Sequence, residues 1–315
     1  MFGAICGDVL GAPYEVNTVT FKDFILLADN SRFTDDTVCT LAVASSIIDG
    51  TFDFAASLRR WGKRFQVPYG PMFEAWIWSD EPSNNSAGNG SVSRIASIPW
   101  LADSLGQTLE WAAASAMTSH RHPDSVDAVC AATAAAWLAI EGWPKDRVRE
   151  VIEEAIGYDL TTPLDHIRPD FGFRLLASET APVAIRSVLE GNDFEDVMRL
   201  SISMGGDADT IAAVAGGIAE AYYPIPRDMQ DHVFRRLPPE VRQALVEFNA
   251  RKRQVAEPRA PPDAEVAAVI EVLRERVGHW RQLIEAGPIT FRSRCRKMLA
   301  KMREAVRLPP TSAVG

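Results

Sequence analysis

Apolar positions recur every three or four residues along most of this chain, and the alternation that marks strands is scarce. Two local signals support particular helix ends: Gly50 follows one apolar stretch directly, and Pro123 falls in the first turn of another. We therefore expect an all-α fold. The pattern predicts helices over residues 37–49, 92–104, 108–117, 123–141, 145–156, 180–190, 193–203 and 210–222.

One stretch interrupts the helical pattern. Residues 66–91 are rich in Gly, Pro, Ser and Asn, and they predict a long surface loop around a short aromatic segment, Phe73 to Trp78. Long loops inside compact helical domains are often functional. We therefore look for candidate chemistry in and beside this loop.

Small residues dominate the predicted helix over 210–222, where Gly216 stands beside Gly217. Each glycine weakens a helix by roughly 1 kcal/mol relative to alanine. We interpret the small residues as the place where a neighbouring helix approaches closely.

The C-terminal part of the chain has a different character. Three prolines in residues 255–263 indicate a linker, so we divide the chain into a body over 1–250, a Pro-rich linker over 251–263 and a basic helical extension over 264–315. Apolar residues at helical spacing over 264–285 predict one buried helix face. They are Val266, Val269, Ile270, Leu273, Val277, Trp280 and Ile284.

Charge separates the same two parts. The net charge is −9, yet residues 251–315 hold 14 Lys and Arg against 7 Asp and Glu, which leaves −16 for the body. An acidic body does not attract nucleic acid, but it suits a site that gathers cations. The stretch from Phe291 to Arg307 is strongly basic. Either the extension docks on the acidic body, or its basic part recruits an anionic partner, nucleic acid or an acidic protein.

Composition excludes several other classes of protein. Hydrophobic residues make up 47% of the 315 residues, enough to bury a large core. No apolar run predicts a membrane span, and Asp8 interrupts the apolar start, so we expect neither a membrane segment nor a signal peptide. The four cysteines form no paired motif, which favours reduced thiols in a cytoplasmic protein. They are Cys6, Cys39, Cys130 and Cys295.

Two acidic motifs stand directly before predicted helices. They are FTDDT (33–37) and GGDADT (205–210). Either motif alone is explained by helix capping, for which Asp and Thr are suited. One cap needs one side chain, however, whereas each motif supplies two acids and neighbouring hydroxyls. If the motifs meet in space, their four carboxylates repel unless cations neutralise them, and all-oxygen ligands suit Mg²⁺ or Mn²⁺.

Three further motifs have both a plain and a chemical interpretation. NSAGNGS (85–91) is typical of a turn, yet its glycines would also let an anion approach the backbone. GDVLGAPYE (7–15) ends on Glu15, either a surface acid or a catalytic one. In SHRHP (119–123) the two histidines, His120 and His122, either bind a metal or serve a cap or surface role.

Together these motifs resemble the ADP-ribosylglycohydrolase family, which includes the dinitrogenase reductase-activating glycohydrolases. The resemblance covers about residues 1–250 in order. It rests on GAICGDVLGAPYE, FTDDT, SAGNGSVSR, SHRHPDSVDA and GGDADT. It implies a compact orthogonal multi-helix bundle, two Mg²⁺ or Mn²⁺ ions and hydrolysis of the bond between ADP-ribose and an acceptor.

The resemblance also assigns roles by position. Glu15 matches an acid that acts in catalysis or gating, and Asp36 and Asp207 are the alternative catalytic carboxylates. The implied metal ligands are Thr34, Asp35, Asp36, Asp207, Asp209 and Thr210. The implied substrate-binding residues are Ser86, Gly88, Asn89, Gly90, Ser91 and His120.

This chain departs from the family pattern at three serines. Ser86 stands where some relatives carry an acid, Ser93 replaces the usual methionine before Arg94, and Ser119 replaces a threonine. A non-catalytic ADP-ribose reader is the main alternative. A helical metal phosphohydrolase needs a His-Asp dipeptide, which this sequence lacks. The expected partner is an ADP-ribosylated protein or a small ADP-ribose adduct, and the acceptor linkage stays open.

Overall fold

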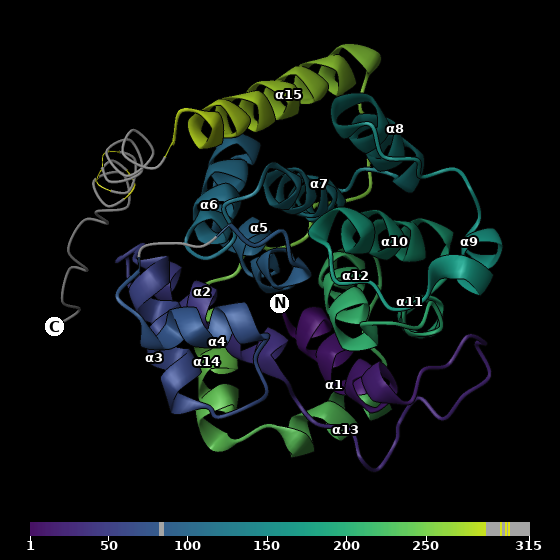
Figure 1. The fold of residues 1–315 in the computed structure, drawn as a ribbon. Helices are drawn as coiled ribbons and strands as arrows, with labels where there is room; N and C mark the ends of the chain where they lie inside the picture. Colours follow the sequence, from purple (N-terminus) through teal and green to yellow (C-terminus); the bar gives the residue numbers. More distant parts are fainter. Residues whose placement is uncertain (82–84, 288–296, 298–299, 301, 303–315) are drawn as a thin grey trace, which may run out of the picture.

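The computed structural model describes residues 1–81 and 85–287, together with Lys297, Ala300 and Met302. Within this part of the chain all regular elements are helical, and β-pairing is limited to two isolated bridges. This confirms the all-α prediction (Figure 1). The α-helices are α1 (Phe2–Val16), α2 (Asp35–Ile48), α3 (Phe54–Arg64), α4 (Pro71–Trp78), α5 (Ile98–Leu101), α6 (Leu105–Met117), α7 (Pro123–Ile140), α8 (Lys145–Ile156), α9 (Leu164–Phe171), α10 (Ala177–Glu190), α11 (Phe194–Ile202), α12 (Ala208–Tyr222), α13 (Arg227–Arg236), α14 (Pro239–Asn249) and α15 (Asp263–Glu285).

Seven of the predicted helices correspond to α2, α6, α7, α8, α10, α11 and α12, with ends within three residues. The helix predicted over 92–104 is wrong. This region instead contains only the short 3₁₀ turn η2 (Ser93–Ile95) and the four-residue α5, and a second 3₁₀ turn, η1 (Asn89–Ser91), lies just before it. Pro99 explains the break, because proline fits the first turn of α5 but cannot donate inside a longer helix.

The predicted long loop over 66–91 is also partly wrong, because its aromatic segment forms α4. Pro71 occupies the first turn of this helix, and the preceding Gly70 ends the extended stretch. Phe73 and Trp76 point into the core, whereas Trp78 stays exposed. Residues 85–88 of the predicted loop keep an irregular backbone, and residues 85–90 border the cavity described below.

The closest helix pair, α1 and α12, lies near the middle of the body (Figure 1). A Cβ added to Gly7 would lie 2.0 Å from the backbone oxygen of Ala212, and one added to Gly3 would lie 2.2 Å from that of Gly216. Only glycine permits this approach, so the small-residue interpretation of 210–222 is confirmed. The contact brings the C-terminal end of α1 to the N-terminal end of α12.

The helix predicted over 264–285 is α15, which packs on α6, α7 and α8 with its apolar face buried (Figure 1). The linker is also bound to the body, because Ala256 N–H donates to the Ile140 carbonyl at 2.8 Å. Docking is therefore observed for this part of the extension. The basic stretch from Phe291 to Arg307 lies outside the described residues except for three positions, and its role stays a prediction.

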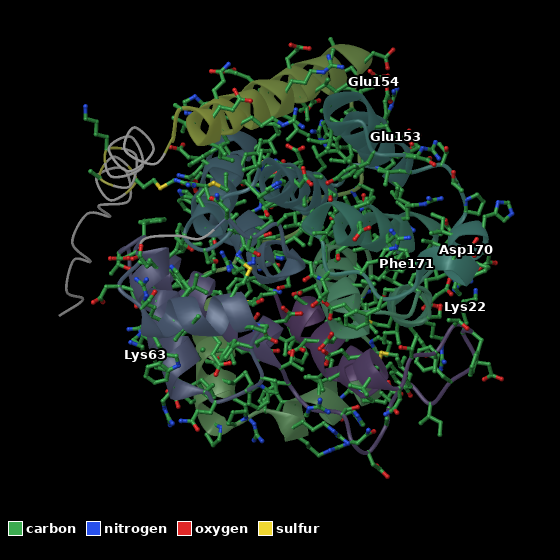
Figure 2. The ribbon with its side chains drawn as sticks, in the orientation of Figure 1. Lys22, Lys63, Glu153, Glu154, Asp170 and Phe171 are labelled. Carbon is green, nitrogen blue, oxygen red and sulfur yellow. The ribbon has the colours of Figure 1, made fainter. Side chains whose placement is uncertain are left out.

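Lys63 and Glu154 are examples of charged side chains that lie exposed at the periphery (Figure 2). No helix of the described residues has the length and apolar character needed to cross a membrane. Cys6, Cys39 and Cys130 are buried free thiols, and Cys295 lies outside the described residues.

Candidate active site

A cavity of about 630 Å³ opens where the ends of α1, α2 and α12 meet α4 and the loop over 85–90. Ligand sites in proteins typically measure 300–1,000 Å³, so a nucleotide-sized molecule fits. The lining residues combine a cluster of acids, a polar wall and an apolar rim. The acids are Glu15, Asp35, Asp36, Asp207 and Asp209.

The first acidic motif begins α2 with more acid than capping requires. Thr34 is the N-cap residue, and its hydroxyl accepts a long hydrogen bond from Asp36 N–H at 3.4 Å. The Thr34 hydroxyl also donates to Asp8. Capping therefore accounts for Thr34, while Asp35 and Asp36 are left facing the cavity.

Asp8 organises this motif from within α1. Its buried carboxylate accepts from the backbone N–H groups of Thr34 and Thr37 at 2.9 and 3.2 Å, and from both hydroxyls. No role in the site was predicted for Asp8 from the sequence. The signal was present, since a lone acid inside an apolar helix needs partners to offset its burial.

The second acidic motif begins α12. Asp207 stands at the N-cap position, but its side chain makes no capping hydrogen bond. It instead accepts from the side-chain amide of Asn89 at 2.6 Å. The Thr210 hydroxyl donates to Asp36 at 2.7 Å, and this contact joins the two motifs directly. The meeting that the sequence only suggested is thus observed.

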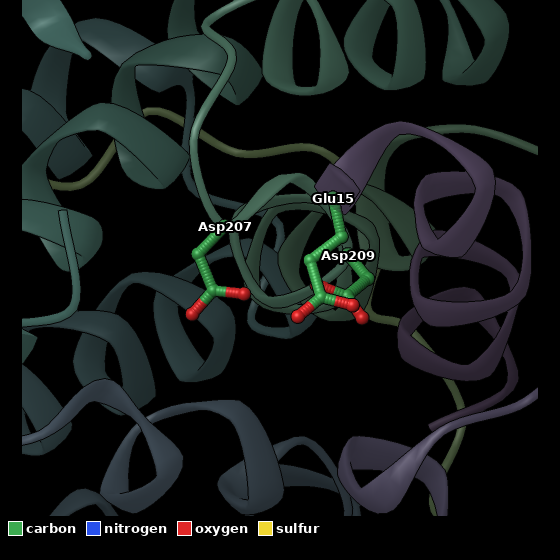
Figure 3. Close-up of side chains that lie close together, drawn as sticks. All are labelled: Glu15, Asp207 and Asp209. Carbon is green, nitrogen blue, oxygen red and sulfur yellow. The ribbon is translucent and has the colours of Figure 1, made fainter. Parts of the chain in front are cut away.

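Glu15 completes the cluster from the last turn of α1. One carboxylate oxygen each from Glu15, Asp207 and Asp209 lies within 4.8 Å of the other two (Figure 3). Glu15 is partly exposed, whereas the two aspartates are buried. Glu15 therefore lies beside two other carboxylates at the edge of the cavity, and its role stays a prediction.

Burial and repulsion between carboxylates raise the pKa of Asp35, Asp36 and Asp209. Burial raises the pKa of Asp36 to about 7, and the charges of Asp8 and Asp207 add to the rise. Burial also raises the pKa of Asp35 and Asp209 well above the ordinary value, with Asp36 contributing to both shifts. The cluster therefore resists carrying its full negative charge unless positive charge is nearby.

The loop over 85–90 and His120 form the polar wall. A Cβ added to Gly88 or Gly90 would lie 3.5 or 3.7 Å from His120 Nε2, so the glycines leave room beside this ring. Burial lowers the pKa of His120 well below its ordinary value, and the Ser119 hydroxyl lies 2.8 Å from its Nδ1. His120 is therefore a neutral imidazole with Nε2 beside the loop.

Three residues singled out from the sequence do not line the cavity. Thr34 and Ser91 are buried but do not line the cavity, and the Ser91 hydroxyl donates to the Gly88 carbonyl at 3.0 Å. Their predicted site roles stay predictions. His122 caps α7 by accepting from Asp124 N–H at 3.2 Å, which confirms the cap interpretation for that residue.

Two features of the cavity were not predicted from the sequence. Buried Arg94 lines it and donates to the Ser115 carbonyl at 2.6 Å, and burial lowers the Arg94 pKa to about 10. An apolar rim surrounds part of the mouth, and no periodic signal marked it. The exposed rim residues are Met72, Phe173, Leu175 and Leu176.

Known proteins match this chain over most of its length. A sequence model described as ADP-ribosylglycohydrolase matches residues 1–260. The ADP-ribosylarginine hydrolase Tri1 of Pseudomonas putida (strain GB-1) is 27% identical over 264 residues, covering 71% of this chain and 70% of the relative. The ADP-ribosylhydrolase ARH3 of Mus musculus is 23% identical over 304 residues, covering 70% of this chain and 82% of the relative.

A solved structure of an ADP-ribosylglycohydrolase-related protein complex superposes with a TM-score of 0.56 and 24% sequence identity. The match covers 88% of this chain and 95% of that chain. At this level of identity the likeness speaks for the fold, and it confirms the expected fold type.

Proposed function

This chain belongs to the ADP-ribosylglycohydrolase family, and we propose that it hydrolyses the glycosidic bond between ADP-ribose and an acceptor with the help of divalent cations. The observation that carries the proposal is the convergence of five carboxylates on one cavity of about 630 Å³. The names of two relatives, an ADP-ribosylarginine hydrolase and an ADP-ribosylhydrolase, support it. The proposed substrate is an ADP-ribosylated protein or a small ADP-ribose adduct.

The proposed cation ligands are all oxygens, which suits two Mg²⁺ or Mn²⁺ ions better than zinc. The Thr34 and Thr210 hydroxyls donate their protons to Asp8 and Asp36, so lone pairs remain on both oxygens. When bound, the cations would supply positive charge that orients ribose hydroxyls and lowers the pKa of an attacking water. The six proposed ligands are Thr34, Asp35, Asp36, Asp207, Asp209 and Thr210.

The polar wall is the proposed binding surface for the ribose and diphosphate. His120 is neutral, and its Nδ1 lies 2.8 Å from the Ser119 hydroxyl. In the tautomer that accepts from Ser119 at Nδ1, the ring proton is on Nε2 and can be donated to a substrate oxygen. The glycines of the loop admit the substrate close to this nitrogen. The other proposed contacts are Ser86, Gly88, Asn89, Gly90 and Ser91.

Glu15 is the proposed general base. Burial and the neighbouring Asp207 raise its pKa, which makes it a stronger base than an ordinary surface carboxylate. It would take the proton of the water that attacks the anomeric carbon. Negative charge beside that carbon favours an oxocarbenium-like transition state. Asp36 and Asp207 are the alternative bases.

A panel of ADP-ribosyl adducts with defined linkages tests this function. Arginine-linked, serine-linked and small-molecule adducts are incubated with the protein in Mg²⁺, in Mn²⁺ and after chelation, and released ADP-ribose is measured. Release of ADP-ribose from at least one adduct, dependent on added cation, is the expected result. Tight ADP-ribose binding without release from any adduct would instead make the protein a reader.

A further inference from the structure

Arg94 lies in η2 and lines the cavity, although only 1% of the residue is exposed. Two nitrogens of its guanidinium are used at the end of α6, where Nε donates to the Ser115 hydroxyl at 3.3 Å and Nη2 to the Ser115 carbonyl at 2.6 Å. The last carbonyls of a helix have no partner inside it, so these contacts have a structural purpose. The third nitrogen, Nη1, donates to no described residue and is not closed off from solvent. Because the rest of the residue is buried, this free edge faces the cavity.

The same guanidinium lies in the polar wall, beside His120. Arg94 Nη2 and the His120 backbone N–H donate to one carbonyl, that of Ala116, at 3.4 and 2.8 Å. Both side chains border Phe73, whose ring centre lies 5.9 Å from the guanidinium carbon and 6.4 Å from the centre of the imidazole. Gly90 precedes Arg94 by four residues, and a Cβ added to Gly90 would lie 3.7 Å from His120 Nε2. The free edge of Arg94 therefore belongs to the wall that carries this glycine.

The charge of Arg94 distinguishes it from the other residues of the cavity. Among the described residues that line the cavity, five have carboxylates and only Arg94 has a cationic side chain. Those carboxylates repel a diphosphate, and the proposed cations are held by the carboxylates themselves. A fixed guanidinium supplies a separate positive charge, and its N–H groups form a fork that suits phosphate oxygens. Burial strengthens the attraction, because water and salt screen it less.

We propose that Arg94 binds the diphosphate of the ADP-ribosyl substrate, with Nη1 donating to a phosphate oxygen while Nε and Nη2 hold the guanidinium on α6. The inference rests on the proposed function, because that function assigns the polar wall to ADP-ribose. A charge-assisted hydrogen bond of this kind contributes at least about 10-fold to affinity. Arg94 thus adds affinity for the nucleotide and none for the cations.

Arg186 offers a matched control. This arginine of α10 is 2% exposed and does not line the cavity. Its Nε and Nη2 are closed off from solvent and donate to no described residue. Arg94→Met and Arg186→Met thus remove the same buried group, and only the first removes it from the cavity. Arg94→Lys keeps the positive charge but loses the fork.

The experiment titrates the full chain with ADP-ribose and with ADP in Mg²⁺ by calorimetry, and measures Mn²⁺ binding without nucleotide by electron paramagnetic resonance. Arg94→Met is expected to bind both nucleotides at least about 10-fold more weakly than the wild type, because both carry the diphosphate. Its Mn²⁺ affinity should not fall, since the change removes a positive charge and no proposed ligand. Arg94→Lys should bind the nucleotides with an affinity between those of Arg94→Met and the wild type, and Arg186→Met should bind every ligand as the wild type does.

Unchanged nucleotide affinity in folded Arg94→Met overturns the inference and leaves the proposed function intact. A loss for ADP-ribose alone also overturns it, since the contact would then be to the terminal ribose. Parallel losses of nucleotide and Mn²⁺ affinity, or the same nucleotide loss in Arg186→Met, overturn it in favour of a packing role.

Urea unfolding in chelator shows whether each variant is folded. If Arg94→Met is not, Arg94→Lys decides, and wild-type affinity for both nucleotides in that variant overturns the inference, because lysine has no free edge to offer. A wild-type protein that binds no ADP-ribose overturns the proposed function itself, and the role of Arg94 with it.

Discussion

Replacing Asp36 with Asn should stabilise the cation-free protein while abolishing hydrolysis. The change keeps the shape of the side chain and an oxygen that can accept from the Thr210 hydroxyl. In the wild type this hydroxyl donates to Asp36 at 2.7 Å. The change removes a charge that is buried among other acids. The same charge is proposed to hold a cation, so the loss of activity and the gain of stability have one cause.

The magnitude follows from the pKa of Asp36, which rises from 3.8 to about 7, chiefly through burial. When the pKa of a carboxyl is higher in the folded protein than in the unfolded chain, the folded protein loses stability as the pH rises between those two values. At pH 8 this rise in pKa lowers the free energy of unfolding by about 4 kcal/mol, and Asp36→Asn should recover it. At pH 4 the Asp36 carboxyl stays protonated in the folded protein, and its cost to the free energy of unfolding falls below about 1 kcal/mol.

Urea unfolding in chelator, followed by circular dichroism at pH 4, 6 and 8, measures this effect. Asp103→Asn supplies the control, because it makes the same change of side chain at an exposed position outside the cavity. Asp36→Asn should gain stability over the wild type progressively as the pH rises. A gain that is absent at pH 8, or that does not change with pH, refutes the argument from buried charge.

Three further changes test other parts of the structure. Glu15→Gln should slow single-turnover release of ADP-ribose far more than it weakens ADP-ribose binding measured by calorimetry, and equal losses would make Glu15 a plain binding residue. Gly7→Ala should lower the free energy of unfolding by about 2 kcal/mol or more, because its Cβ would lie 2.0 Å from the Ala212 oxygen. Gly278→Ala, which meets nothing within 4 Å, should stabilise α15 slightly, and equal effects of the two changes would refute close packing of α1 on α12. A 1–254 truncation should still hydrolyse small adducts but unfold more easily, since the surfaces beneath α15 become exposed; a folded truncation without activity would place the C-terminal part in the active site.

The long apolar helices of the core were predictable from the sequence alone. Almost every residue of α7 and α12 is buried, and both segments are apolar and rich in alanine, which favours helix. Charged residues interrupt the apolar pattern in α3 and α13, two of the helices that were not predicted. Ten-residue α13, for example, buries Met229, His232 and Val233 among exposed charges. Tertiary packing, rather than periodicity, decides such surface helices.

The candidate site was likewise predictable only in part. The acids of FTDDT and GGDADT could be found in the sequence because each motif is short and stands at a helix start. The contact between them could not, since Thr210 and Asp36 are 174 residues apart. The apolar rim at 173–176 escaped for the same reason, because only the folded chain brings it to the cavity.

The most direct test of the account is single-turnover release of ADP-ribose from a defined adduct, with and without divalent cations. The wild type should release ADP-ribose in Mg²⁺ or Mn²⁺ and lose this activity on exhaustive chelation, and Asp209→Ala should be inactive in either condition although it stays folded. Full activity in the chelated enzyme, or in folded Asp209→Ala with cations present, would contradict the claim that the acidic cluster is a cation-dependent hydrolytic centre.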